Sequence, residues 1–368
     1  MRPPAQEDDL TVFILTCNRH QLLIRTISYW RATSVVVHII DGSSKHFGNA
    51  ELIPPNIFYH HFPAFPSESV QSNYARRMRF GASLAKSKYS ALCGDDDFFT
   101  HSGIIRSLEI LDSNDEIDLV MRPCLYYEEM DDGLRWTLEY GAWIPNGYES
   151  SKNLVDRLTR SERILLTYYG ICRTDIWVSI LNLSFERVYS HKFANEFLMC
   201  ELGRAMLRIQ VLNEVLWIRE LNNAEKYRDD LSTFRQWLRS RDNSHEIAHL
   251  EIQLQLGIGS LCATARQMNS AIATRLIMNY HRSYRLMISQ IIGRALVSAG
   301  RVLSPVHRLR INQLLPRWLS TELGFRGTAL IKNRQKLDDL FEYLKKSEIG
   351  YSETDLREFE NLMTENTD

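Results

Sequence analysis

Short apolar runs alternate with stretches of helical spacing through the first third of the chain. The runs LTVFILT (residues 10–16), SVVVHII (34–40) and YSALCG (89–94) are rich in aliphatic and β-branched side chains, as buried strands are. Strands that alternate with helices predict a mainly parallel sheet with helices on both faces, and we therefore expect an α/β fold. The remaining expected elements are strands at 57–62 and 117–123 and helices at 22–30, 67–86 and 102–114.

The composition suits a protein with a substantial core and excludes some classes. Of the 368 residues 44% are apolar, and the formal net charge of −1 lacks the basic excess of a nucleic-acid-binding protein. The six cysteines form no CxxC pair, which favours free thiols in a reducing compartment over zinc ligands. The first residues lack the apolar core of a signal peptide, and no apolar run is long enough to span a membrane. We therefore expect a cytoplasmic protein with no nucleic-acid partner.

A change of pattern divides the chain in two. Strands and helices alternate up to about residue 225, a polar stretch follows Tyr227, and the remainder has helical character. We therefore expect an α/β domain over residues 1–228 and a C-terminal helical domain over residues 229–368.

Three adjacent aspartates, at residues 95–97, follow the buried run 89–94 directly. In a parallel sheet, ligands bind beyond the carboxyl ends of the strands. Thr16 and Asp41 also stand at such ends. The sequence therefore predicts a binding site at this edge of the sheet.

Carboxylates this close together need a compensating charge. Mg²⁺ or Mn²⁺ would provide it, because these ions take carboxylate and phosphate oxygens as ligands. If the strand geometry continues, Asp95 and Asp97 point the same way and Asp96 is opposed. The alternative is a solvated turn in which Asp97 or Thr100 caps the following helix.

The order of several motifs resembles that of a known enzyme family. The motifs are Asn18-Arg19, Asp41-Gly42-Ser43, Ala85-Lys86-Ser87-Lys88-Tyr89 and Asp95-Asp96-Asp97. In their order and spacing, residues 10–225 resemble the donor half of a GT-A-fold glycosyltransferase and are similar to the family-two-type inverting enzymes. The resemblance implies a GT-A-like, Rossmann-like sheet in residues 1–228, flanked by helices.

The resemblance also implies roles for residues at the sheet edge. Asp97, together with Asp95, would hold Mn²⁺ or Mg²⁺. Ile40 stands where the family often has a further aspartate that reads uracil, which leaves the donor nucleotide open. The nucleotide sugar would be bound by Thr16, Asn18, Arg19, Asp41, Asp95 and Arg219.

A general base for the acceptor hydroxyl is expected in FANEFLMCELGRA, residues 193–205. Inversion needs one carboxylate that deprotonates the attacking hydroxyl opposite the leaving diphosphate. The resemblance implies Glu196, and Glu201 remains the second choice because Phe197 departs from the family pattern. Arg219 matches a position that would hold pyrophosphate, a task that suits a guanidinium fork. For Arg76, Arg77 and Arg79 the interpretation is a solvated helix face, with contact to the diphosphate as the alternative.

The stretch between Glu251 and Glu322 contains nine arginines and no lysine or acidic residue. Apolar residues fill the gaps between the arginines, and such a segment is typical of a helix that lies on an anionic bilayer. This would hold an enzyme at the inner face of the cytoplasmic membrane, beside a lipid-linked acceptor. The alternative is a helical bundle whose arginines pair with the acidic tail at 338–368.

Together these features lead to one expected function and two alternatives. We expect a metal-dependent, hexosyltransferase-type enzyme that moves a sugar, with inversion, from a nucleotide-diphosphate donor to a saccharide or lipid-linked saccharide in bacterial surface-polysaccharide synthesis. A nucleotidyltransferase of related fold would show a glycine-rich loop after the first strand, and TCNRHQ has no glycine. A non-catalytic binding module that keeps the fold is disfavoured by the intact Asp95 and Asp97.

Overall fold

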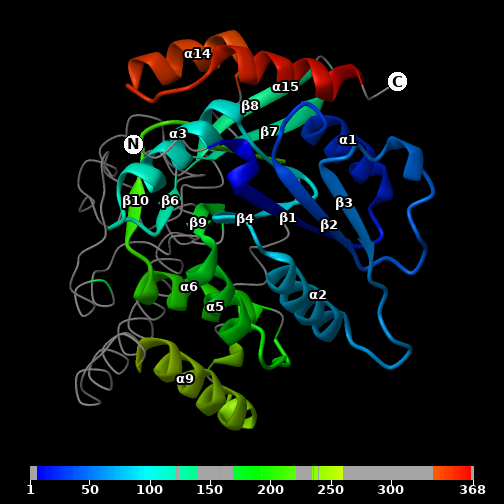
Figure 1. Ribbon diagram of the computed structural model, residues 1–368, viewed down its shortest axis with the longest axis vertical. Helices are drawn as coiled ribbons and strands as arrows, with labels where there is room; N and C mark the ends of the chain where they lie inside the picture. The colour runs from blue at the N-terminus through cyan, green and yellow to red at the C-terminus, as the bar shows by residue number, and fades with distance from the viewer. Residues whose placement is uncertain are drawn as a thin grey trace, which may run out of the picture.

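The protein, whose structure is a computed structural model, has two β-sheets with helices packed against them (Figure 1). The larger sheet is mainly parallel and has helices on both faces, which confirms the α/β fold predicted from the alternating runs. The structure describes residues 6–121, 124–131, 133–139, 157, 169–191, 193–220, 234, 236–238, 240–259 and 335–365.

The larger sheet is built from the apolar runs of the first half of the chain. Among its described strands, only β9 runs antiparallel to its neighbours. In spatial order its strands are β10 (Ile209–Val211), β6 (Leu119–Met121), β9 (Ile171–Arg173), β4 (Tyr89–Gly94), β1 (Leu10–Thr16), β2 (Val36–Asp41) and β3 (Ile57–His61).

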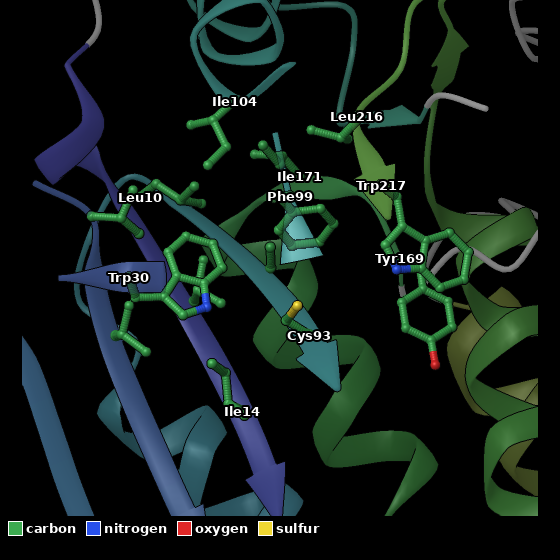
Figure 2. Close-up of a cluster of buried hydrophobic side chains, with 14 of the residues drawn as sticks. Leu10, Ile14, Trp30, Cys93, Phe99, Ile104, Tyr169, Ile171, Leu216 and Trp217 are labelled. Atoms are coloured by element: carbon green, nitrogen blue, oxygen red, sulfur yellow. The ribbon is translucent and has the colours of Figure 1, made fainter. Parts of the chain in front are cut away.

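Strand β1 supplies the cores on both faces of this sheet. Side chains alternate along a strand, so Leu10, Val12 and Ile14 pack on one face while Phe13 packs on the other. Figure 2 shows the first of these cores, with Trp30 among aliphatic side chains of the sheet. The first face is covered by α1 (His20–Trp30) and α3 (His101–Ser113), and the second by α2 (Val70–Leu84), α5 (Thr174–Ser184) and α6 (Phe193–Met206).

A second, smaller sheet lies beside the carboxyl end of β4. Two helices near the C-terminus, α14 (Leu337–Lys346) and α15 (Glu353–Glu365), pack on it, as Figure 1 shows in orange and red. The ring centre of Phe359 lies 5.1 Å from the ring centre of Phe98 and 5.6 Å from that of Trp136. The strands of this sheet are, in order, β5 (Asp97–Phe99), β11 (Trp217–Glu220), β7 (Cys124–Met130) and β8 (Gly133–Glu139).

Of two helix starts considered from the sequence, one differs in the structure and one agrees. Helix α2 begins later than the predicted start at residue 67, because its cap is Ser69, whose hydroxyl accepts from the amide of Ser72 at 3.1 Å. The chain is still turning at Ser67, because the amide of Glu68 donates to the carbonyl of Phe65. Helix α3 is capped by Thr100, one of the two residues that the sequence offered.

The described part of the C-terminal region is helical, as expected. Helix α9 (Ser244–Gly259) packs on α5 and α6, so it shares a core with the larger sheet. The domain division at residue 228 stays a prediction, and the arginine-rich stretch lies outside the described residues after position 259. In the described chain no helix has the length and apolar character needed to cross a bilayer.

Short 3₁₀ helices lie at Glu7–Asp9, Ala50–Leu52 and Arg241–Asn243.

Candidate functional site

The parallel register brings the predicted polar residues to one edge of the larger sheet. Thr16 pairs with Asp41 at the ends of β1 and β2, and Leu15 pairs with Gly94 at the end of β4. The aspartates begin at the next residue after Gly94. The polar residues predicted at the strand ends therefore do gather at one edge of the sheet, and their role in binding stays a prediction.

Asp95 is held by donors from β1 and the turn after it. The hydroxyl of Thr16 donates to Oδ2 of Asp95 at 2.6 Å, and Nη1 of Arg19 donates to Oδ1 at 2.6 Å. Thr26 of α1 fixes the backbone as well, because its hydroxyl donates to the carbonyl of Asp95 at 2.8 Å. Both carboxylate oxygens of Asp95 thus have protein donors, and the side chain is 4% exposed.

The three aspartates do not continue the strand, so the predicted alternation of their side chains is wrong. Strand β4 ends at Gly94, and β5 of the other sheet starts at Asp97. Arg19 therefore reaches two adjacent carboxylates, with Nη2 donating to Oδ2 of Asp96 at 3.0 Å. A Cβ atom at Gly94 would lie 2.8 Å from an oxygen of both Asp96 and Asp97, so glycine makes room for these carboxylates.

Asp97 is paired with an arginine from a distant part of the chain. Strands β5 and β11 are antiparallel, and Arg219 stands directly opposite Asp97 with Nε 3.6 Å from Oδ1. The guanidinium of Arg219 lies 5.4 Å from the ring centres of both Tyr169 and Trp217, which stack on each other (Figure 2). The two rings and the ladder hold Arg219 in place at the edge of the site.

Burial makes the ionised aspartates costly in this cluster. Desolvation raises the pKa of Asp95 to about 6, although Arg19 and Thr16 oppose the shift. Desolvation also raises the pKa of Asp97 to about 7, against the opposing charge of Arg219. Carboxylates with shifted pKa values are enriched at functional sites, because binding and catalysis there depend on such shifts.

Asp41 forms a second buried carboxylate centre next to the first. His20 Nε2 lies 2.8 Å from its Oδ2, and the Tyr59 hydroxyl donates to the same oxygen at 2.7 Å. Ser43 donates its amide to Oδ1 at 2.8 Å and its hydroxyl to the same atom. Burial pushes the pKa of Asp41 upward, but the hydrogen bonds from Ser43, Tyr59 and His20 outweigh it and keep the pKa below its ordinary value.

The turn between β1 and α1 is shaped by contacts to this second centre. Asn18 adopts a φ of 57°, a left-handed conformation that asparagine tolerates, and its amide donates to the hydroxyl of Ser43 at 2.6 Å. Arg19 follows at the N-cap of α1, from where its side chain reaches the aspartates. His20, Tyr59 and Ser43 could not be predicted as partners of Asp41, since their contacts depend on the register of β1 to β3.

The prediction of a solvated helix face is wrong for Arg77 of α2. Its side chain is buried, with Nη1 donating to the carbonyl of Thr16 at 2.7 Å. A Cβ atom at Gly42 would lie 2.7 Å from Nε of Arg77, so glycine allows the guanidinium beneath the strand ends. Arg76 and Arg79 do lie nearer the surface, and Arg76 pairs with Glu68. Helical spacing alone could not tell which arginine of the three faces the sheet.

The two candidate bases lie on α6. Glu196 stands in its first turn and is partly buried, whereas Glu201 is 2% exposed. The donors to Asp95 and the partner of Asp97 described above come from β1, the turn after it, α1 and β11, and not from α6. The choice between the two carboxylates stays a prediction.

The carboxylate oxygens of the three aspartates are of the kind that bind a hard divalent cation. Asp97 Oδ1 is buried and, among the described residues, accepts no hydrogen bond. Carboxylate oxygens with phosphate oxygens and water are the usual ligands of Mg²⁺ and Mn²⁺. No group of three or more His, Cys, Asp or Glu side chains in the described chain is placed to hold a metal ion by itself. A cation here would therefore need ligands from a bound phosphate as well.

Comparisons with known proteins identify no family for this chain. No protein-family model matches it, and no curated protein does. Among solved structures it is similar to crystal structures of TarS from S. aureus. One covers 70% of this chain and 44% of TarS, less than half of that protein, at 12% identity and a TM-score of 0.40.

Two shorter TarS structures, of residues 1–349, give similar values. One covers 68% of this chain and 70% of its own at 13% identity and a TM-score of 0.40. The other, a complex with UDP-GlcNAc, covers 72% and 79% at 11% identity and a TM-score of 0.39. Likeness at this level leaves the function of the chain to be argued from its own residues.

Proposed function

We propose that this protein is a metal-dependent glycosyltransferase with a GT-A-like donor domain. It would move a sugar, with inversion, from a nucleoside-diphosphate donor to a hydroxyl of a saccharide or lipid-linked saccharide. The observation that carries the proposal is the cluster of three buried carboxylates where β1, β2 and β4 end, held between Arg19 and Arg219.

The cluster suits an anionic, phosphate-bearing ligand that arrives with a cation. Buried acidic side chains with raised pKa values favour a bound cation over bulk water as their partner. In the proposal, Asp97 and Asp95 hold Mn²⁺ or Mg²⁺, which when bound neutralises the charge of the departing diphosphate. Arg219, held beside the stacked rings of Tyr169 and Trp217, would donate to the same diphosphate.

The nucleotide would lie over the turn that follows β1. Thr16, Asn18 and Arg19 line that turn, and Asp41 acts on it by fixing Ser43, which accepts from the Asn18 amide. On the acceptor side, Glu196 would take the proton of the attacking hydroxyl, with Glu201 as the second choice. Inversion then follows from attack opposite the leaving diphosphate.

The proposed setting is the synthesis of a bacterial surface polysaccharide at the inner face of the cytoplasmic membrane. This part of the proposal rests on the nine arginines between Glu251 and Glu322, with no acidic residue among them. A segment of that composition is attracted to anionic lipid headgroups.

A screen of nucleotide sugars by thermal shift tests the proposed function. UDP-, GDP-, dTDP- and CMP-sugars are added with Mn²⁺ or with EDTA, and at least one should raise the melting temperature only when Mn²⁺ is present. The stabilising donor should then be hydrolysed slowly to the free nucleotide. No stabilisation by any nucleotide or nucleotide sugar would contradict the proposal, and release of pyrophosphate would indicate nucleotidyl transfer instead.

A further inference from the structure

The two arginines at the aspartates are held in different ways. Arg219 is 9% exposed at its side chain and lies beside the stacked rings of Tyr169 and Trp217. Arg19 is 34% exposed and hydrogen bonds to Asp95 and Asp96 from a turn at the rim of the site. Arg219 is therefore a fixed part of the wall, whereas Arg19 can leave its partners without disturbing a packed core.

Arg19 takes up oxygen atoms that a cation would need. With Thr16 on Oδ2 and Arg19 on Oδ1, both oxygens of Asp95 have protein donors within 2.6 Å. A divalent ion on Asp95 would also stand close to the guanidinium, and two positive charges at such a distance repel each other. Cation and guanidinium therefore compete for one position.

We propose that Arg19 is a built-in counter-cation, which neutralises Asp95 and Asp96 in the nucleotide-free protein and turns to the diphosphate when a divalent cation takes its place. The proposal rests on the proposed function and adds the order of events to it. Arg19 keeps the carboxylates compensated while the site has no ligand. After the exchange, the guanidinium finds new acceptors on the same ligand that brought the cation.

This exchange makes metal and nucleotide binding cooperative. A cation that arrives alone must displace Arg19 and leaves it without an acceptor, so binding of metal alone is weak. A nucleoside diphosphate offers that acceptor, so each ligand strengthens the binding of the other by the same factor. The protein thereby avoids trapping free metal ions in the site.

The test measures Mn²⁺ affinity in wild type, Arg19→Gln, Arg19→Lys and Arg79→Gln. Arg79 lies exposed on α2 and serves as the matched control. Free Mn²⁺ is followed by electron paramagnetic resonance, first alone and then with UDP, GDP or dTDP, whichever binds wild type most tightly. Melting temperatures verify that each variant is folded.

For Mn²⁺ alone, we expect Arg19→Gln to bind about fivefold or more tightly than wild type, because the competing charge is gone. The strengthening of Mn²⁺ binding by the nucleotide should shrink by a similar factor. Arg19→Lys keeps a positive charge and should stay near wild type for Mn²⁺ alone, as should Arg79→Gln.

Unchanged or weaker binding of Mn²⁺ alone by Arg19→Gln would overturn the exchange, because a purely supporting Arg19 would weaken the site when removed. The proposed function would survive that result if wild type still bound nucleotide with Mn²⁺. If wild type binds neither Mn²⁺ nor any of the nucleotides, the proposed function fails, and the exchange fails with it.

Discussion

At the scale of single residues, Gly94 decides how closely the carboxylates gather. It ends β4 at the point where the chain passes from one sheet to the other, and the oxygens of Asp96 and Asp97 occupy the space that a side chain would fill. The spacing of the aspartates thus depends on a residue that carries no chemistry itself.

Gly94→Ala should disturb the site more than the fold. Its Cβ would come within 2.8 Å of two carboxylate oxygens, and the ends of these side chains must shift to make room. We expect Mn²⁺-dependent nucleotide binding to weaken at least about tenfold, with a loss of unfolding free energy of roughly 1–2 kcal/mol. Both are measurable by titration calorimetry and denaturant unfolding.

Gly48→Ala is the control, because no atom lies within 4 Å of a Cβ atom built there. It should bind nucleotide as wild type does. Equal binding by Gly94→Ala and Gly48→Ala would mean that the positions of these carboxylates do not matter for the ligand.

At the scale of elements, strands and helices with a local signal of their own could be predicted from the sequence. Strands β1 to β4 were predicted from short, mostly apolar runs, and their parallel order placed Thr16, Asp41 and the aspartates at one edge. The roles assigned to these residues stay predictions. What the sequence established is their common location.

Elements defined by distant partners were missed. Strand β5 has three residues and exists because β11, far along the chain, pairs with it and sets Arg219 opposite Asp97. The local hairpin of β7 and β8 was missed as well, although GLRWTLE alternates apolar and polar residues and Asp-Asp-Gly, a typical turn sequence, leads into it. No local pattern in the chain predicts the pairing of β5 with β11.

The pair of histidines on β2 and β3 predicts how stability depends on pH. His38 Nδ1 lies 2.9 Å from His60 Nε2, and the His38 ring stacks on Phe13 and Phe58. Burial, with the charges of His60 and Lys86, lowers the pKa of His38 from 6.5 to about 4. Between these values the unfolded chain binds more protons than the folded one, so stability rises with pH and is lost as pH falls.

When the pH falls from 7 to 4, we expect the free energy of unfolding to decrease less in His38→Gln than in wild type. The difference should be about 1–2 kcal/mol, less than the full shift implies, since water partly screens the ring. His245→Gln, exposed on α9, should follow the wild-type curve. Parallel pH curves for wild type and His38→Gln would contradict the stated cause. Urea unfolding at several pH values gives the curves.

At the scale of the whole molecule, the site joins two sheets that rest on different parts of the chain. Asp95 directly follows β4 of the larger sheet, while the smaller sheet carries Asp97 and Arg219 and is covered by α14 and α15 (Figure 1). Residues near the C-terminus therefore support a site assembled from the first hundred residues and β11. The sequence predicted helices near the C-terminus but did not predict that they pack on the smaller sheet.

The central claim is that the buried aspartates bind a cation that in turn binds a diphosphate. Titration calorimetry of the nucleotide found in the screen tests it with wild type, Asp97→Asn and Asp339→Asn, each in Mn²⁺ and in EDTA. Asp339 is exposed on α14 and is the matched control. We predict that wild type and Asp339→Asn bind at least about tenfold more tightly in Mn²⁺, and that Asp97→Asn shows no such gain. Equal affinity of wild type in Mn²⁺ and in EDTA, or a full gain in Asp97→Asn, would contradict the claim.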